Sequence, residues 1–204
     1  MHTIRECLDS SCAFRFPAEL DHPIGNVCPK CGKRTTTVAK FASQLVPEAV
    51  STNPKRHIVG ILDNIRSIHN VGACFRTADG AGLRHLYLCG ITATPDHRKV
   101  AKTALGSEQA VAWSYHPNAL HLAGQLKETG YQLWALEGGT HAENLLTTTI
   151  LDERIALIVG NEVSGVDPAL LVMCDQIVAL PMRGIKASLN VGTAFGVAAY
   201  RLTG

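Results

Sequence analysis

The stretch HNVGACFRTADGAG, residues 69–82, decides the fold of this chain. Four of its apolar residues recur at intervals of three or four, as on the buried face of a helix: Val71, Cys74, Phe75 and Ala78. Asn70 and Arg76 stand among these small and apolar neighbours, and Arg76 lies off the apolar stripe. The pattern predicts a helix over residues 70–82 that packs closely on a sheet, and its two polar residues need their own explanation.

From His57 onward, short apolar runs alternate with helical patterns, which is typical of α/β proteins. The apolar runs predict strands over residues 57–64, 84–90, 131–139, 154–162 and 176–182. Further helices are expected over residues 117–130, from about residue 167, and over residues 188–202. We therefore expect one α/β domain over residues 57–204, with a mostly parallel sheet and helices on both of its faces.

The first 36 residues are a different kind of segment, rich in cysteine and turn residues and without apolar periodicity. Cys7 and Cys12 are separated by four residues, Cys28 and Cys31 by two, and the two pairs by fifteen. This spacing is typical of a tetrahedral four-thiolate zinc site, which would supply folding energy that so short a segment lacks. We predict a zinc-ribbon-like module with structural zinc over residues 1–36 and a connector over residues 37–56. Four reduced cysteines, or a disulfide pair, are the alternatives.

The composition is that of a core-forming protein, with 46% hydrophobic and 18% charged residues. The net charge of +2 is too small to establish a nucleic-acid partner by itself. Seven cysteines, an odd number distributed in this way, indicate a reducing compartment. Because neither a long apolar run nor a signal-like N-terminus is present, we expect no membrane association and predict a cytoplasmic protein.

Three loops that follow predicted strands are rich in glycine and small polar residues. They read ALEGGTH over residues 135–141, VGNEVSGVD over 159–167 and LPMRGIKASLN over 180–190. Loops at the carboxyl ends of parallel strands share one edge of the sheet, where ligands bind. The same residue types also end strands for purely local reasons, and no GxGxxG fingerprint is present. The loops predict a binding site but do not identify its ligand.

Taken in order with the opening stretch, these loops resemble the SpoU-type (TrmH-like) RNA ribose 2′-O-methyltransferases of the SPOUT superfamily. The matching motifs are NVGACFRTADGAG over residues 70–82, IVGNEVSGVD over 158–167 and LPMRGIKASLNVGTAFGVAAY over 180–200. The resemblance begins near His57 and does not include the cysteine-rich segment. There the family often carries a different RNA-binding extension.

The resemblance implies an enzyme that transfers a methyl group from S-adenosylmethionine to a ribose 2′-hydroxyl in structured RNA, either tRNA or rRNA. It also implies a deep C-terminal trefoil knot that holds the cofactor, and an obligate homodimer whose catalytic residues meet across the interface. The catalytic residues that it implies are Asn70, Arg76, Glu162, Ser188 and Asn190. The residues that it places against the cofactor are Leu136, Gly160, Leu180, Met182 and Leu189.

Local explanations compete with several of these roles. Asn70 also fits a plain helix N-cap, and Arg76 fits an ion pair with Asp79 on a solvated face. Ser188 fits a cap of the last helix, whereas Asn190 is expected past the cap, which favours a functional role. Motif and local explanations are compatible for Asn70 and Ser188.

The chemistry expected of Arg76 follows from its charge and its place on the helix. Helical side chains lean toward the N-terminus, so Arg76 is expected over Gly72, beside a bare patch that suits a phosphate. A guanidinium hardly deprotonates, so we expect it to clamp the phosphate and stabilise a developing alkoxide. Asn70 is expected to fix the ribose, and Glu162 to orient Asn70 or Arg76.

Two other functions remain open at this point. One is a non-catalytic zinc-ribbon RNA-binding protein that retains the fold, although the intact set of Arg76, Glu162 and Asn190 argues against it. The other is a base methyltransferase of the same superfamily, although the RTA and SLN motifs favour the ribose.

Overall fold

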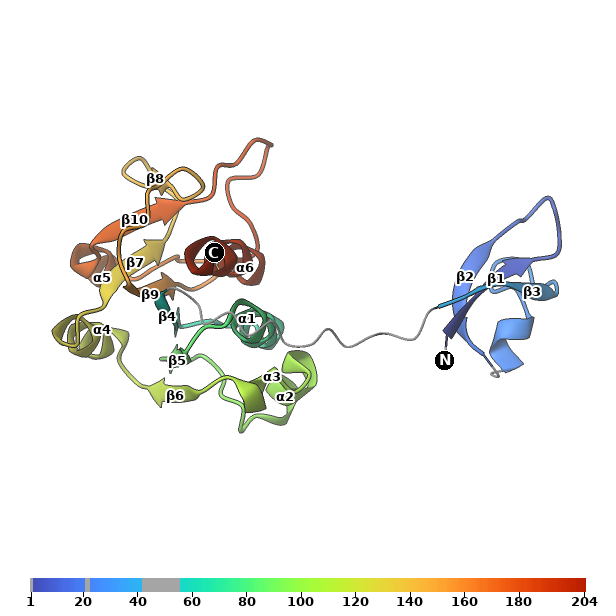
Figure 1. Ribbon diagram of the computed structural model, residues 1–204, viewed down its shortest axis with the longest axis horizontal. Coiled ribbons are helices and arrows are strands. Elements are labelled where there is room, and N and C mark those ends of the chain that lie inside the picture. Colours follow the sequence, from blue (N-terminus) through green and yellow to red (C-terminus); the bar gives the residue numbers. More distant parts are fainter. Residues whose placement is uncertain (1, 21–22, 42–55) are drawn as a thin grey trace. The chain divides into compact units, whose positions relative to one another are not determined.

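The computed structural model describes residues 2–20, 23–41 and 56–204, which form two compact units, one within residues 1–52 and one within 53–204 (Figure 1). The smaller unit is a three-stranded antiparallel sheet in the order β2-β1-β3. Its elements are β1 (His2–Cys7), β2 (Arg15–Glu19), the short 3₁₀ helix η1 (Pro23–Asn26) and β3 (Thr35–Lys40).

The strand β3 continues four residues beyond the predicted end of the module at residue 36. Only Thr35 of this strand is buried, and the five residues after it are exposed. A strand with one buried residue has no apolar alternation, which is why the sequence pattern does not predict it. Most of the predicted connector, residues 42–55, lies outside the described residues.

The larger unit is built on a seven-stranded sheet in the order β6-β5-β4-β9-β7-β10-β8, and every pairing within it is parallel. Its strands are β4 (His57–Asp63), β5 (His85–Cys89), β6 (Trp113–His116), β7 (Gln132–Leu136), β8 (Glu143–Asn144), β9 (Arg154–Val159) and β10 (Gln176–Ala179). The predicted α/β class with a mostly parallel sheet is confirmed.

Helices cover both faces of this sheet, as predicted (Figure 1). One face carries α1 (Ile68–Ala81), α2 (Arg98–Ala104), α3 (Ser107–Ala110) and α6 (Val191–Thr203). The other face carries α4 (Ala119–Glu128) and α5 (Pro168–Met173). α1 and α6 pack on strands of the first face and α4 on a strand of the second, whereas α2 and α3 pack against α1.

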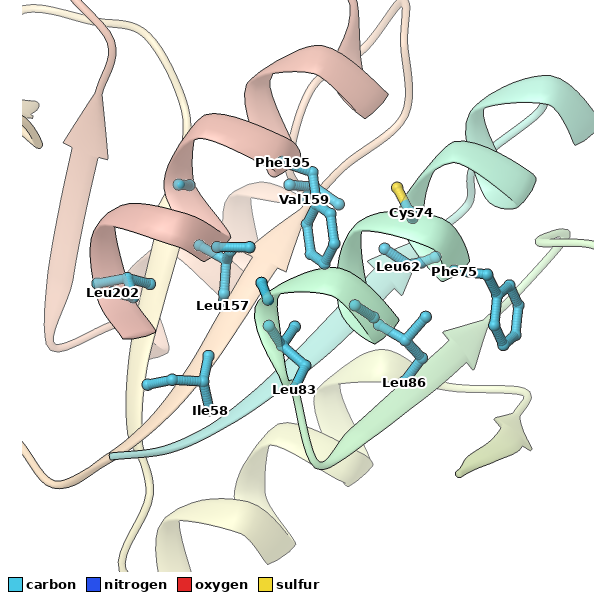
Figure 2. Packing of buried hydrophobic residues seen from close by; sticks show 14 of the residues in the cluster. Ile58, Leu62, Cys74, Phe75, Leu83, Leu86, Leu157, Val159, Phe195 and Leu202 are labelled. Carbon is cyan, nitrogen blue, oxygen red and sulfur yellow. The ribbon is translucent and has the colours of Figure 1, made fainter. Parts of the chain in front are cut away.

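The interior strand β4, which lies between β5 and β9, supplies apolar side chains to both faces. Ile58 and Leu62 belong to the cluster under α1 and α6, whereas Val59 and Ile61 belong to the cluster under α4. Figure 2 shows side chains of the strands, α1 and α6 meeting in the first cluster. A strand buried on both faces has a continuous apolar run instead of alternation, as HIVGIL has here.

The sequence pattern does not predict α3, β6 or β8, and it leaves residues 97–102, where α2 forms, open between a solvated helix and a loop. Few side chains of these elements are buried, with only Val100 and Ala104 buried in α2. With so few buried apolar side chains, these elements have no clear period.

The deep C-terminal trefoil knot that the resemblance implies stays a prediction. No helix of the described part of the chain is long and apolar enough to cross a membrane.

Candidate active site

A cavity of about 680 Å³ lies at the carboxyl ends of β7, β9 and β10. The three glycine-rich loops that follow these strands form most of its wall. All five residues expected to contact a cofactor line it: Leu136, Gly160, Leu180, Met182 and Leu189. Its volume is within the range of small-molecule sites, and its largest side chains are apolar, which suits a flat heterocycle.

Gly160 is required here by the fold of its own loop. A Cβ atom on Gly160 would lie 2.3 Å from the carbonyl oxygen of Gly165 and 2.4 Å from the backbone nitrogen of Val166. These are backbone atoms, so no flexible side chain can move aside. The turn that follows β9 can pack over residue 160 only because the residue is glycine, and this close packing shapes the cavity wall.

The carboxylate of Glu162 fixes the start of α1. Its two oxygens accept hydrogen bonds from the backbone N–H groups of Arg66 and Ser67, both at 2.9 Å. They also accept one from Nδ2 of Asn70 at 2.8 Å. At the other end of the Asn70 amide, Oδ1 accepts a hydrogen bond from Nδ2 of Asn190 at 2.9 Å. Glu162, Asn70 and Asn190 therefore form one continuous chain of hydrogen bonds across the three motifs.

These hydrogen bonds stabilise the charged form of Glu162. Burial would raise the pKa of its carboxyl, but the N–H groups of Arg66 and Ser67 and the amide of Asn70 together hold the pKa below its ordinary value. A carboxylate that accepts several N–H groups is stabilised in its charged form. Glu162 is therefore an anion at neutral pH, and its charge fixes the donor end of the Asn70 amide toward it.

The helix caps differ from those expected. Ser67 is the N-cap of α1, so Asn70 lies inside the first turn, only 8% exposed. Asn190 is itself the N-cap of α6, and its Oδ1 accepts the N–H groups of Gly192 and Thr193 at 3.0 and 3.3 Å. Asn190 thus combines a capping role with its bond to Asn70.

Ser188 is not a cap, because α6 begins only after Asn190. It is exposed in the loop before the helix and lines the cavity together with Glu162 and Asn190. Its hydroxyl is therefore open to a bound molecule.

Arg76 does not line the cavity of its own chain. It is exposed on α1 and makes no hydrogen bond or ion pair within the described residues, so the ion pair with Asp79 does not form. The patch expected to be bare at Gly72 is covered, because Thr103 of α2 lies against that glycine. A Cβ on Gly72 would lie 2.2 Å from Oγ1 of Thr103. The guanidinium is left free to meet another molecule.

The four cysteines of the smaller unit converge, with all four Sγ atoms within 4.8 Å of one another. Cys7 and Cys31 are 3.4 Å apart at sulfur, and Cys12 and Cys28 are 3.9 Å apart. A tetrahedron of thiolates around zinc has sulfur–sulfur edges of about 3.8 Å, given zinc–sulfur bonds of about 2.3 Å. No disulfide joins any of the four, and the donor set fits zinc.

Two polar residues of the site were not assigned from the sequence. Asn161 ties three segments together, donating to the carbonyl of Asn64 at 2.8 Å and accepting N–H groups of the turn after β9. Glu137 lies at the end of β7 on the cavity wall. Both stand in loops that the sequence singled out, but one amide or carboxylate beside glycine is typical of an ordinary turn.

Known proteins match this arrangement. The family model described as SpoU rRNA Methylase family matches residues 57–200. The 23S rRNA (guanosine-2′-O-)-methyltransferase RlmB of Pasteurella multocida is 28% identical over 169 residues, and that of Haemophilus ducreyi is 34% identical over 145 residues. The structure of the TrmH/SpoU tRNA modifying enzyme of A. aeolicus superposes with a TM-score of 0.65 at 28% identity, covering 74% of this chain and 76% of that one.

This chain matches only part of the length of the two curated relatives. The two alignments cover 80% and 70% of this chain, but only 66% and 57% of the respective relatives. The family match begins at residue 57 and leaves out the cysteine-rich unit.

Proposed function

We propose, from the premise that this chain belongs to the SpoU rRNA Methylase family, that it methylates the ribose 2′-hydroxyl of a nucleotide in structured RNA, with S-adenosylmethionine as the methyl donor. The observation that carries this proposal is the cavity itself. All five expected cofactor residues line it, and so do Glu162 and Asn190, the two residues that hold Asn70 by hydrogen bonds. The RNA is a tRNA or an rRNA in this proposal.

The cavity suits the cofactor chemically. Leu136, Leu180 and Leu189 offer apolar surface for the adenine, and the loop backbone offers hydrogen-bonding groups around it. When bound there, S-adenosylmethionine supplies a methyl group already activated by its positive sulfur. The protein must then align the ribose oxygen with that methyl group and assist loss of the hydroxyl proton.

Asn70 and Arg76 are the residues that we assign to the ribose and its phosphate. Asn70 is held by Glu162 on one side and Asn190 on the other, so its orientation is fixed before RNA binds. Arg76 would pair with the phosphate and stabilise the developing alkoxide, because an always-protonated guanidinium is a poor base.

A homodimer accounts for the position of Arg76. The side chain has no partner among residues 2–20, 23–41 and 56–204 and lies outside the cavity of its own chain, so a second copy would bring an Arg76 to each cavity. The face beside it carries exposed apolar surface on α6, with Val197 40% and Tyr200 59% exposed. We propose that two copies cover this face and exchange their Arg76 side chains.

Mixed dimers test this arrangement directly. Arg76→Ala removes the guanidinium, and Leu189→Arg blocks the cavity at a side chain that is 42% exposed. Each variant alone should be inactive. A mixed dimer would contain one site with both residues intact if Arg76 acts across the interface, and would recover activity. If Arg76 acts within its own chain, every site in the mixture is damaged and no activity returns.

The four-cysteine cluster is proposed to hold one structural zinc ion. With four thiolate ligands the coordination shell is closed, so the metal supports the fold of the small unit and takes no part in methyl transfer. The unit also carries exposed Lys30, Arg34 and Lys40, which suit RNA phosphates. A thiolate-bound zinc site is compatible with the cytoplasmic location predicted from the cysteines.

Calorimetric titration of the zinc-loaded protein with S-adenosylhomocysteine tests the cofactor proposal. Saturable binding at one site per chain, lost in Leu189→Arg, is the expected result. Transfer of labelled methyl groups to tRNA and rRNA, followed by nucleoside analysis, then separates ribose from base methylation. A folded, dimeric protein that binds no S-adenosylhomocysteine, with or without RNA, would favour the non-catalytic RNA-binding alternative.

A further inference from the structure

Glu137 is a carboxylate that the proposed chemistry does not yet use. It directly follows β7 and lines the cavity beside Leu136. Its Oε2 accepts the N–H of Val166 at 2.8 Å, and its Oε1 accepts the N–H of Gly138 at 3.1 Å. The carboxylate therefore lies between the loop after β7 and the turn after β9.

Close packing holds this carboxylate in place. A Cβ on Gly165 would lie 2.5 Å from Oε2 and 3.3 Å from Oε1 of Glu137, and Gly165 has a backbone φ of +76°. Only glycine combines that φ with the absence of a side chain at no steric cost. Residue 165 thus lets the turn lie against Glu137, and the carboxylate is fixed on the cavity wall before any ligand arrives.

Glu137 has acceptor capacity to spare, which Glu162 largely lacks. The carboxylates among the cavity residues are Glu137 and Glu162, and the cavity wall contains no lysine, arginine or histidine. Oε1 of Glu162 already accepts from both Ser67 and Asn70. Each oxygen of Glu137 accepts one N–H group, although a carboxylate has about four acceptor positions in all. Glu137 is therefore placed to accept two further hydrogen bonds from a ligand.

We propose that Glu137 binds the two vicinal hydroxyl groups of the cofactor ribose. This inference rests on the proposed function, because it needs the cofactor in this cavity. The adenine is expected against Leu136, the neighbour of Glu137 in the chain, and the ribose is bonded directly to the adenine. The vicinal hydroxyls are two adjacent donors, which matches the two free acceptor positions of one carboxylate. Glu137 is thus a cofactor-binding residue that also pins the turn after β9.

The test is a set of binding measurements with two ligands that share the adenine and ribose. S-Adenosylhomocysteine carries the amino-acid portion, and 5′-methylthioadenosine lacks it. Glu137→Gln keeps an oxygen for the N–H of Val166 but loses the charge and one acceptor. We expect it to weaken both ligands by the same factor, about tenfold or more. Glu143→Gln, at an exposed carboxylate of β8 outside the cavity, should leave both affinities unchanged.

A ligand change sharpens the assignment to the ribose. The 2′-deoxy form of 5′-methylthioadenosine should bind the wild-type protein more weakly than the parent compound. Glu137→Gln should bind the two compounds almost equally, because the carboxylate that accepts the 2′-hydroxyl is then absent. Thermal unfolding of Glu137→Gln without ligand should remain close to that of the wild-type protein.

The remaining outcomes all count against the proposal. Weaker binding of S-adenosylhomocysteine alone would assign Glu137 to the amino-acid portion, and unchanged affinities would leave it only a loop-fixing role. If the wild-type protein bound neither ligand, the proposed function would fail and this inference with it. If the wild-type protein binds and Glu137→Gln binds equally, only the inference fails.

Discussion

The two units of this chain are stabilised in different ways. Within its described residues, the smaller unit buries five residues: Thr3, Cys7, Gly25, Cys28 and Thr35. The larger unit buries two extended apolar clusters, one on each face of its sheet. The smaller unit has almost no aliphatic core, so its stability must come from the cysteine cluster and polar contacts, such as those of Arg5 with Thr35, Thr37 and Asn26.

The comparison predicts that metal loss will unfold one unit and spare the other. Chelation of zinc, or Cys28→Ser, should remove hydrogen-exchange protection from β1 to β3 while α1 and β4 keep theirs. Structural zinc contributes on the order of 10 kcal/mol to folding in comparable modules, so this is the largest expected effect. Cys174→Ser, outside the cluster, is the matched control. Full protection of β1 to β3 after chelation would show that the small unit does not depend on metal.

Truncation of a core side chain should destabilise the larger unit and spare the smaller one. Phe195 is fully buried on α6 and lies near Gly60 of the interior strand β4. Phe195→Ala should lower the free energy of unfolding of the larger unit by about 3–5 kcal/mol, because it leaves a cavity under α6. Urea denaturation followed by tryptophan fluorescence reports on this unit, since Trp113 and Trp134 both belong to it. A loss well below 1 kcal/mol would mean that this core repacks freely.

Arg76 is expected to matter for turnover and not for the stability of its own chain. Arg76 makes no hydrogen bond or ion pair with the described residues of its own chain, so Arg76→Lys should leave thermal unfolding unchanged. Turnover should fall by about a hundredfold or more, since a lysine cannot reproduce the planar fork of donors on a phosphate. RNA binding should be partly retained. Equal turnover in the two proteins would contradict the role proposed for Arg76.

The smallest expected effect is the change in folding stability at acidic pH. Glu162 has a lowered pKa in the folded state, so the unfolded chain binds more protons on this group near and below its ordinary value of 4.5. Its contribution to stability is therefore complete above that pH and is lost as the pH falls through the folded pKa. Melting temperatures of the wild-type protein and Glu162→Gln should converge as the pH is lowered from 7 toward 3. A constant difference across this range would show that the charge of Glu162 adds no stability.

The sequence alone determined the features that depend on local order along the chain. The Cys7–Cys12 and Cys28–Cys31 spacings predicted a cluster whose sulfur atoms do converge. Apolar runs such as HIVGIL predicted the buried strands, because a strand covered on both faces has no polar alternation. The three motifs predicted the family and the loops that line the cavity, since strand ends of a parallel sheet share one edge.

The tertiary structure decided which side chains meet. Asn70 and Glu162 are 92 residues apart in the chain, and Asn70 and Asn190 are 120 apart, yet each pair is joined by one hydrogen bond. Thr103 of α2 covers Gly72, and Arg76 does not line the cavity of its own chain. Periodicity reports which face of an element is buried. It cannot report which distant donor reaches a given acceptor, because that depends on how the elements pack.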